Sequence, residues 1–210
     1  MTDKNELFRR MLRQARANGV PFHTVLGDTW FASEKNMEMI HGELRQTFVF
    51  GLKANRLAIR HGEERRAKAW TGIGELGLEE GVATKVWLKG LEFPAAILRH
   101  IHRNMDGSEA VIYLCTNDLS LTGEQILNSY QKRWAVEEYH KSIKQNTALK
   151  RAPLWSVRSL LNHVWASLCA YVKLEALSLS KELNQFALKA KIRFAAQQAA
   201  LQAYLKLSSA

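Results

Sequence analysis

Residues 130–137 read YQKRWAVE, and a lysine at position 144 completes a group of four polar side chains. Tyr130, Arg133, Glu137 and Lys144 stand at offsets of 0, 3, 7 and 14 residues. On one continuous helix, with about 100° per residue, these offsets place all four side chains within a stripe about 60° wide. One acid flanked by two cations and a phenol suits a site that binds a metal ion and holds phosphates around it.

The same residues also have an ordinary explanation. Arg133 with Glu137, and Glu137 with Lys141, have the i,i+4 spacing of exposed ion pairs on a helix. On these residues alone, a solvated helix face is the simpler interpretation. The wider stretch favours a binding surface, because residues 130–158 contain seven Lys or Arg and only two acids.

The composition is that of a soluble, basic protein. Of its 210 residues, 47% are hydrophobic and 24% are charged, with a net charge of +10. This balance favours an anionic partner such as nucleic acid, although charge alone leaves a merely basic protein equally open. Cys115 and Cys169 fit no metal-ligand or disulfide spacing, which favours free thiols in a reducing cytoplasm. The most apolar run, residues 160–177, is interrupted by His163, Lys173 and Glu175, which argues against a membrane span.

The first fifty residues alternate between helical and strand patterns. Apolar residues at helical spacing predict a helix over 5–18, and Ser33 is a suitable cap for a second helix over 34–46. Runs rich in β-forming residues predict strands at 22–26 and 47–52. This order indicates an α/β unit, right-handed and with parallel strands.

The pattern then changes twice. From about residue 52 to 116, glycines become frequent and four runs resemble strands, at 57–60, 84–88, 95–102 and 110–115. With an Asp-Gly corner at 106–107, they predict a mostly antiparallel β insertion. Helices follow at 123–146, 156–178 and 180–205, the first capped by Thr122 with Gln125 as its capping-box partner and the last two divided at Ser180.

The spacing Tyr-x2-Arg-x3-Glu-x6-Lys, with Trp134 directly after the Arg, resembles the Tyr-Arg-Glu-Lys motif of bacterial insertion-sequence transposases. These enzymes belong to the Asp-Asp-Glu (DDE) superfamily, and all four positions match in identity and spacing. In that family the second catalytic Asp ends a core strand, before a loop that carries an aromatic residue. Here the strand at 22–26 leads into Asp28, Trp30 and Phe31. Taken alone, Asp28 is better explained as a turn or capping residue.

The resemblance implies an α/β (α+β) fold, an incomplete RNase H-like catalytic core with a mostly β insertion and C-terminal helices. The expected parts are a partial core at 1–52, a β-rich insertion at 53–118, the Glu-bearing helix at 119–150 and C-terminal helices at 151–210. It implies that Asp28 and Glu137 are catalytic ligands of Mg²⁺. The residues implied to hold DNA phosphates are Tyr130, Arg133, Lys144, Lys150 and Arg151.

One element of the family pattern is missing. The family places its first catalytic Asp on an earlier core strand, whereas the only Asp before Asp28 is Asp3, ahead of a helix. We therefore expect an N-terminally truncated transposase fragment that is inactive alone, since two carboxylates do not hold a symmetric pair of metal ions. The implied partner is double-stranded DNA in the bacterial cytoplasm, at the nucleoid, with no membrane association; a homodimer is left open.

Some residues and functions remain open on the sequence. In some relatives a Trp of the insertion stacks on a base flipped out of the terminal duplex, and Trp70 and Trp87 are the candidates here, although an aromatic residue in a β insertion is more often core. His100 and His102 are better explained as surface residues than as ligands. The alternatives to a transposase fragment are a DNA-binding remnant without catalysis and an unrelated basic α/β protein. The distance between the carboxylates of Asp28 and Glu137 tests the last alternative. A separation within about 10 Å favours the transposase, and a larger one favours the unrelated protein.

Overall fold

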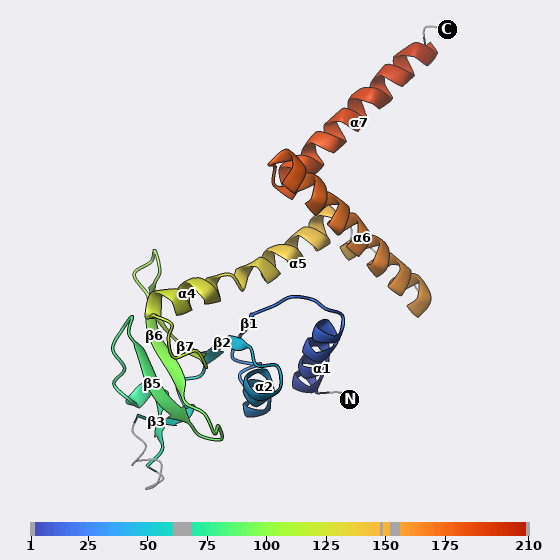
Figure 1. The fold of residues 1–210 in the computed structure, drawn as a ribbon. Coiled ribbons are helices and arrows are strands. Elements are labelled where there is room, and N and C mark those ends of the chain that lie inside the picture. The colour runs from blue at the N-terminus through green and yellow to red at the C-terminus, as the bar shows by residue number, and fades with distance from the viewer. Residues whose placement is uncertain (1–2, 61–68, 148, 152–155, 209–210) are drawn as a thin grey trace. The chain divides into compact units, whose positions relative to one another are not determined.

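The computed structural model describes residues 3–60, 69–147, 149–151 and 156–208 (Figure 1). It divides into two compact units, Met1–Arg133 and Trp134–Ala210. The first combines helices with a mixed sheet, and the second is helical. The predicted α/β class is confirmed.

A seven-stranded sheet in the order β1-β2-β7-β6-β5-β3-β4 forms the centre of the first unit. Its strands are β1 Thr24–Gly27, β2 Thr47–Leu52, β3 Leu57–Ile59, β4 Thr71–Gly72, β5 Ala83–Leu88, β6 Ala95–Arg103 and β7 Glu109–Thr116. β1 and β2 are parallel, as predicted, and every other pairing is antiparallel. Because β7 pairs with β2, the predicted insertion continues the sheet of the first two strands.

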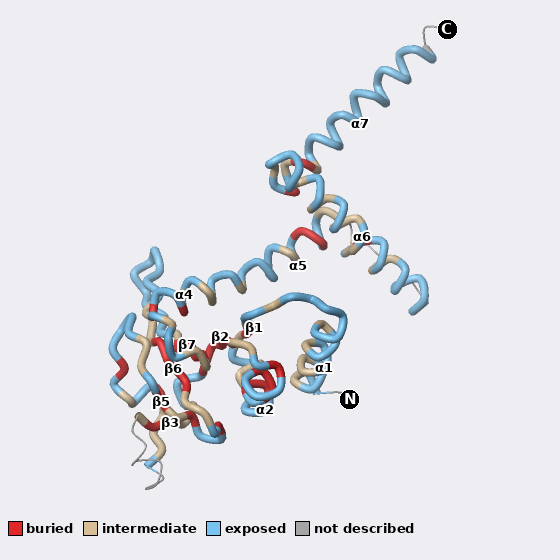
Figure 2. Tube along the Cα trace, in the orientation of Figure 1, coloured by how far each residue is buried: buried red, intermediate tan, exposed pale blue. Residues whose placement is uncertain are grey.

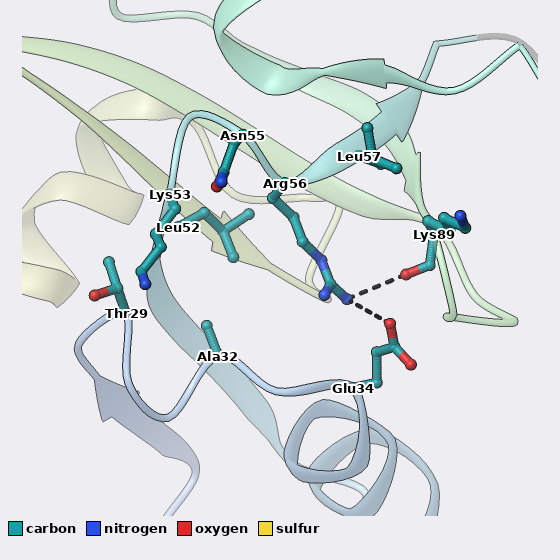
Figure 3. A pocket seen from close by; sticks show the side chains of 9 residues that line it. All are labelled: Thr29, Ala32, Glu34, Leu52, Lys53, Asn55, Arg56, Leu57 and Lys89. Atoms are coloured by element: carbon teal, nitrogen blue, oxygen red, sulfur yellow. Dashed lines mark hydrogen bonds and ion pairs between the residues drawn. The ribbon is translucent and has the colours of Figure 1, made fainter.

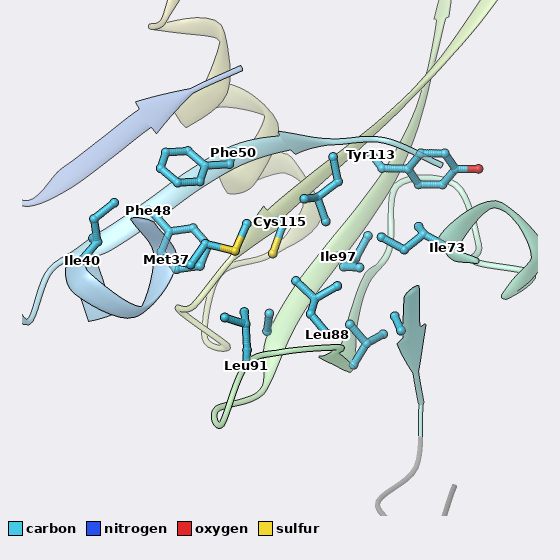
Figure 4. Packing of buried hydrophobic residues seen from close by; sticks show 14 of the residues in the cluster. Met37, Ile40, Phe48, Phe50, Ile73, Leu88, Leu91, Ile97, Tyr113 and Cys115 are labelled. Carbon is cyan, nitrogen blue, oxygen red and sulfur yellow. The ribbon is translucent and has the colours of Figure 1, made fainter. Parts of the chain in front are cut away.

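Alternate residues of β2 supply a core on each face of this sheet. Phe48 and Phe50 join one cluster, together with Met37 and Ile40 (Figure 4). Val49 points to the opposite face and packs with buried side chains that include Ile126. This alternation follows from the two-residue period of a strand, and full burial of each large side chain stabilises the fold by about 1.5–3 kcal/mol.

Two helices cover the first face. α1 Lys4–Ala17 packs Phe8 against the cluster and stacks it on Phe31, with ring centroids 4.7 Å apart. α2 Glu34–Glu38 is capped by Ser33, whose hydroxyl accepts the Asn36 N–H as predicted. The helix expected over 34–46 continues beyond residue 38 as a π-helix, η1 Met39–Glu43, with Leu44 as its C-cap. It ends earlier than predicted, before Arg45, which has φ of 52°.

The predicted helix over 123–146 is also wrong in one respect, because it is two helices. α4 Gly123–Gln131 has the predicted capping box of Thr122 and Gln125, and α5 Trp134–Asn146 follows it. Between them, the N–H groups of Lys132 and Arg133 bond the carbonyls three residues back, at 3.3 and 2.9 Å. This tighter turn interrupts the regular α-helical hydrogen bonds, so the four motif residues belong to two helices and the turn between them.

The second unit contains α5, η3 Leu149–Arg151, α6 Val157–Lys181 and α7 Gln185–Ser208. The break predicted at Ser180 falls instead after Lys181, where Glu182 has φ of 53° and ends α6 in the left-handed conformation. Most of α7 is exposed (Figure 2). Among the described residues, no helix is long and apolar enough to cross a membrane.

Candidate functional site

Asp28 lies directly after β1 and bends the chain toward α2. Its Oδ1 accepts the N–H of Trp30 at 2.9 Å, and its carbonyl accepts the N–H of Phe31 at 3.2 Å. Asp28 therefore stabilises a turn, as its sequence context indicated. Within the described residues, no cation forms an ion pair with the Asp28 carboxylate, which is partly exposed.

Tyr130 reaches the same end of β1 from α4. A Cβ placed on Gly51, the second-last residue of β2, would stand 3.2 Å from Tyr130 Oη and 3.3 Å from Thr29 Cγ2. The phenol hydroxyl and the residue after Asp28 thus lie over the same point of the strand. A glycine in a strand interior permits this close approach, since any side chain would occupy the contact.

Arg133 stands at the end of this arrangement. Its guanidinium carbon lies 5.5 Å from the centroid of the Tyr130 ring, a distance at which the ring face attracts the cation. Tyr130 therefore lies near the loop that contains Asp28, and Arg133 lies beside the Tyr130 ring. A phenol hydroxyl and a guanidinium side by side can hold phosphate oxygens.

Glu137 and Lys144 belong to the second unit. They lie in the first and last turns of α5, seven residues apart, and so within about 20° of one another around the helix. Both are exposed. Their positions also suit the helix dipole, with the acid near the amino end and the cation near the carboxyl end.

The remaining predicted residues are spread over both units. Lys150 is exposed in η3, and the side chain of Arg151 lies outside the described part of the structure. Trp70 and Trp87 are both partly exposed. On β6, His100 is partly buried and His102 is exposed. The separation of Asp28 from Glu137 stays a prediction.

The chain matches the family model described as the transposase DDE domain over residues 2–173. It belongs to this transposase family. The matched range includes Asp28 and the whole motif from Tyr130 to Lys144. Members of the family act on DNA and generally use divalent metal ions. No curated protein matches the chain.

The transposase domain gathers too few ligands for a metal site within its described residues. There, no three or more His, Cys, Asp or Glu side chains lie close enough together to hold a metal ion. The carboxylate of Asp28 has the hard oxygen atoms that Mg²⁺ prefers. Glu137 offers a second carboxylate of the same kind, and a symmetric two-metal centre needs a further one.

Sequence reasoning missed the residues that support Tyr130. Gly51 was read only as part of a strand, although a glycine between Phe50 and Leu52 is a signal of close packing. It also missed the pocket that lies beside Thr29 and contains Lys53 and Arg56 (Figure 3). No local pattern marks this pocket, because its walls come from separate turns of the chain.

Proposed function

We propose that this chain is part of a DDE transposase that cleaves DNA strands at insertion-sequence ends and transfers them to target DNA. The observation that carries the proposal is the placement of Tyr130 against Gly51 and Thr29, with Arg133 over its ring. Tyr130 thereby lies near Thr29, which follows Asp28, and Arg133 lies beside Tyr130. Family membership supports the same assignment.

Each motif residue has a role in this proposal. Asp28 and Glu137 would hold Mg²⁺, which, when bound, would activate the attacking hydroxyl and stabilise the leaving 3′-oxygen. Tyr130 would donate its hydroxyl to a phosphate, and Arg133 would grip phosphate oxygens with its planar fork. Lys144, with Lys150 and Arg151, would add point charges along the DNA backbone. The protein would act in the bacterial cytoplasm, at the nucleoid.

The edge of the sheet offers a place for the missing carboxylate. β1 pairs with β2 on one side, and in the described residues no strand pairs with its other side. An open edge of this kind accepts further strands. We propose that a strand bearing the first catalytic Asp pairs there, on the same chain or as a separate fragment. Without it, the 210 residues would be marginally stable, prone to associate, including as a homodimer, and catalytically silent.

DNA binding is the first test. The protein should bind a labelled duplex in fluorescence anisotropy, with affinity that falls steeply as salt rises, because neutralised phosphates release counterions. Arg133→Ala and Lys144→Ala should each weaken binding about 5–10-fold and reduce the salt slope by about one. Lys181→Ala, at the exposed end of α6, is the matched control and should change little. Salt-insensitive affinity, or no binding at low salt, would contradict the proposal.

A nicking assay distinguishes an incomplete enzyme from a DNA-binding remnant without catalysis. The remnant is favoured by one observation, the use of the Asp28 carboxylate in its own turn. With Mg²⁺ or Mn²⁺ both readings predict silence for the chain alone. Adding the strand fragment should raise its melting temperature and restore cleavage only if the chain is an incomplete enzyme. Robust nicking by the 210-residue chain, abolished by Glu137→Ala, would show that its site is already complete.

A further inference from the structure

A pocket of 380 Å³ lies on the first unit beside the turn of Asp28. Thr29 forms one wall, and the turn that joins β2 to β3 forms another, with Lys53, Asn55 and Arg56 (Figure 3). Lys89, after β5, contributes to the far side. The volume falls in the range of small-molecule and cofactor sites. None of these side chains belongs to the transposase motif.

Hydrogen bonds hold the walls of this pocket in place. The Arg56 guanidinium donates to Glu34 Oε1 at 3.2 Å and to the Lys89 carbonyl at 3.1 Å. The turn itself is closed by the Arg56 N–H on the Lys53 carbonyl, at 3.0 Å. The Ala54 carbonyl accepts the N–H of Gly74 at 2.9 Å, which ties the turn to its neighbour. The pocket is therefore formed before any ligand enters.

The charges in the pocket do not balance. Its cations are Lys53, Arg56 and Lys89, and its one acid, Glu34, is engaged by Arg56. Among the described residues, no carboxylate pairs with Lys53. Figure 3 shows the Lys53 amino group on the side of Thr29, away from the Arg56 guanidinium. An anion beside Thr29 would meet this ammonium together with the Thr29 hydroxyl.

We propose that this pocket binds a phosphate group of the DNA strand that passes Asp28. The inference rests on the proposed function, and it assigns Lys53 as the main contact and Asn55 and Thr29 as hydrogen-bonding partners. Thr29 lies close to Tyr130 Oη, since both approach Gly51. Thr29 also lines the pocket that contains Lys53. A strand that contacts Tyr130 therefore has a second cation within reach on the same unit. Lysine suits this role as a compact point charge for phosphate.

The test compares Lys53→Met with Lys85→Met. Methionine keeps the length of the side chain and removes its charge, and Lys85 is an exposed lysine of β5 that lies outside the pocket. In anisotropy with a labelled 20-base-pair duplex, Lys53→Met should bind about 5–10-fold more weakly and lower the salt slope by about one. Lys53→Arg should retain most of the affinity. Circular dichroism checks that each variant folds.

The possible outcomes test the pocket assignment and the proposed function separately. If the wild type binds DNA and Lys53→Met behaves like Lys85→Met, the pocket assignment is overturned and the transposase proposal stands. If the wild type binds no duplex, the proposed function fails, and titration with inorganic phosphate decides the pocket by itself. Shifts of the Lys53 and Asn55 amide resonances that vanish in Lys53→Met would support an anion site, and unchanged resonances would overturn it.

Discussion

The two units of this chain bury side chains in different ways. In the first, large apolar side chains such as Phe48, Phe50 and Ile97 are 0% exposed. In the second, the described buried residues are Ser142, Ile143, Ser167, Gln185 and Leu188, of which three are polar. Apolar side chains of α7 remain open, with Leu201 at 60% and Tyr204 at 67% exposed.

This difference indicates what holds each unit together. The sheet of the first unit fills both faces with apolar contacts, which supply most of the stability of a small domain. In the second unit, the Ser142 hydroxyl donates to Gln185, and the Gln185 amide donates to Glu175. Buried polar bonds of this kind favour one arrangement of helices more than they add net stability. We therefore expect the second unit to depend on what covers α6 and α7.

The largest contrast should appear between Phe50→Ala and Leu201→Ala. The Phe50 ring stacks on Phe48, with centroids 5.1 Å apart, and lies so close to Gly27 that a Cβ there would be 2.9 Å from it. Removing it should cost about 3–5 kcal/mol of unfolding free energy, because it leaves a cavity in a packed core. Urea denaturation followed by circular dichroism measures this loss.

Leu201→Ala should change the unfolding free energy by less than about 0.5 kcal/mol, since an exposed helical leucine loses few contacts. A cost as large as that of Phe50→Ala would break the comparison. In that case α7 would be covered in solution, and the cost should then depend on protein concentration if a second copy covers it.

A smaller effect is expected where α4 begins. A Cβ on Gly123 would lie 1.9 Å from the carbonyl oxygen of Gly81, a backbone atom that cannot rotate away. Gly123→Ala should therefore shift α4 and cost about 1–3 kcal/mol by overpacking. Because Tyr130 is on the same helix, its placement over Gly51 should be disturbed and DNA affinity should fall as well.

Gly42→Ala is the matched control for this change. Gly42 also lies in a helical segment, η1, but a Cβ there would meet nothing within 4 Å. Alanine should be neutral or slightly stabilising at that position, because it restricts the unfolded chain. Equal losses for the two variants would mean that the approach of Gly81 to Gly123 has no energetic weight.

Features with a local cause could be predicted from the sequence. The strands at 47–52 and 110–115 lie within a residue of β2 and β7, because β-rich runs between glycines and turns carry their own signal. The caps at Ser33 and Thr122 are right for the same reason, since each hydroxyl oxygen accepts the backbone N–H three residues later, within the same turn. The parallel pairing of β1 with β2 followed from the helix between them.

Features that depend on several segments could not be predicted. The turn at 132–133 interrupts α4 and α5 without any proline or glycine, so the apolar period continued across it. Of the candidate site, Tyr130 Oη lies near Thr29, the residue after Asp28, at Gly51, and Arg133 lies beside the Tyr130 ring; the roles of the motif residues stay predictions. Lys53 was not found, because its pocket is created by the pairing of β3 with β5 and has no signature in any single stretch.

The last comparison uses the two cysteines, one in each unit. Cys115 on β7 is buried, and Cys169 on α6 is exposed. In the folded protein, a thiol reagent such as dithionitrobenzoate should modify Cys169 rapidly and Cys115 only as fast as the first unit opens. Equal rates for the two thiols would contradict the tight packing of the sheet, and Cys169→Ser isolates the slow reaction.

Alkaline pH should weaken the first unit through the same thiol. Burial raises the pKa of Cys115 from 9.0 to about 12, against a smaller lowering by Arg56. The unfolded thiol therefore loses its proton near pH 9, while the folded one keeps it, so stability is fully present below pH 9 and declines as pH rises toward 12. The decline should reach at most about 1.4 kcal/mol per pH unit.

Because lysines and tyrosines also titrate there, the measurement is the difference in slope between wild type and Cys115→Ala from pH 8 to 10.5. A Cys115→Ala slope equal to that of wild type would mean that Cys115 meets water in the folded protein.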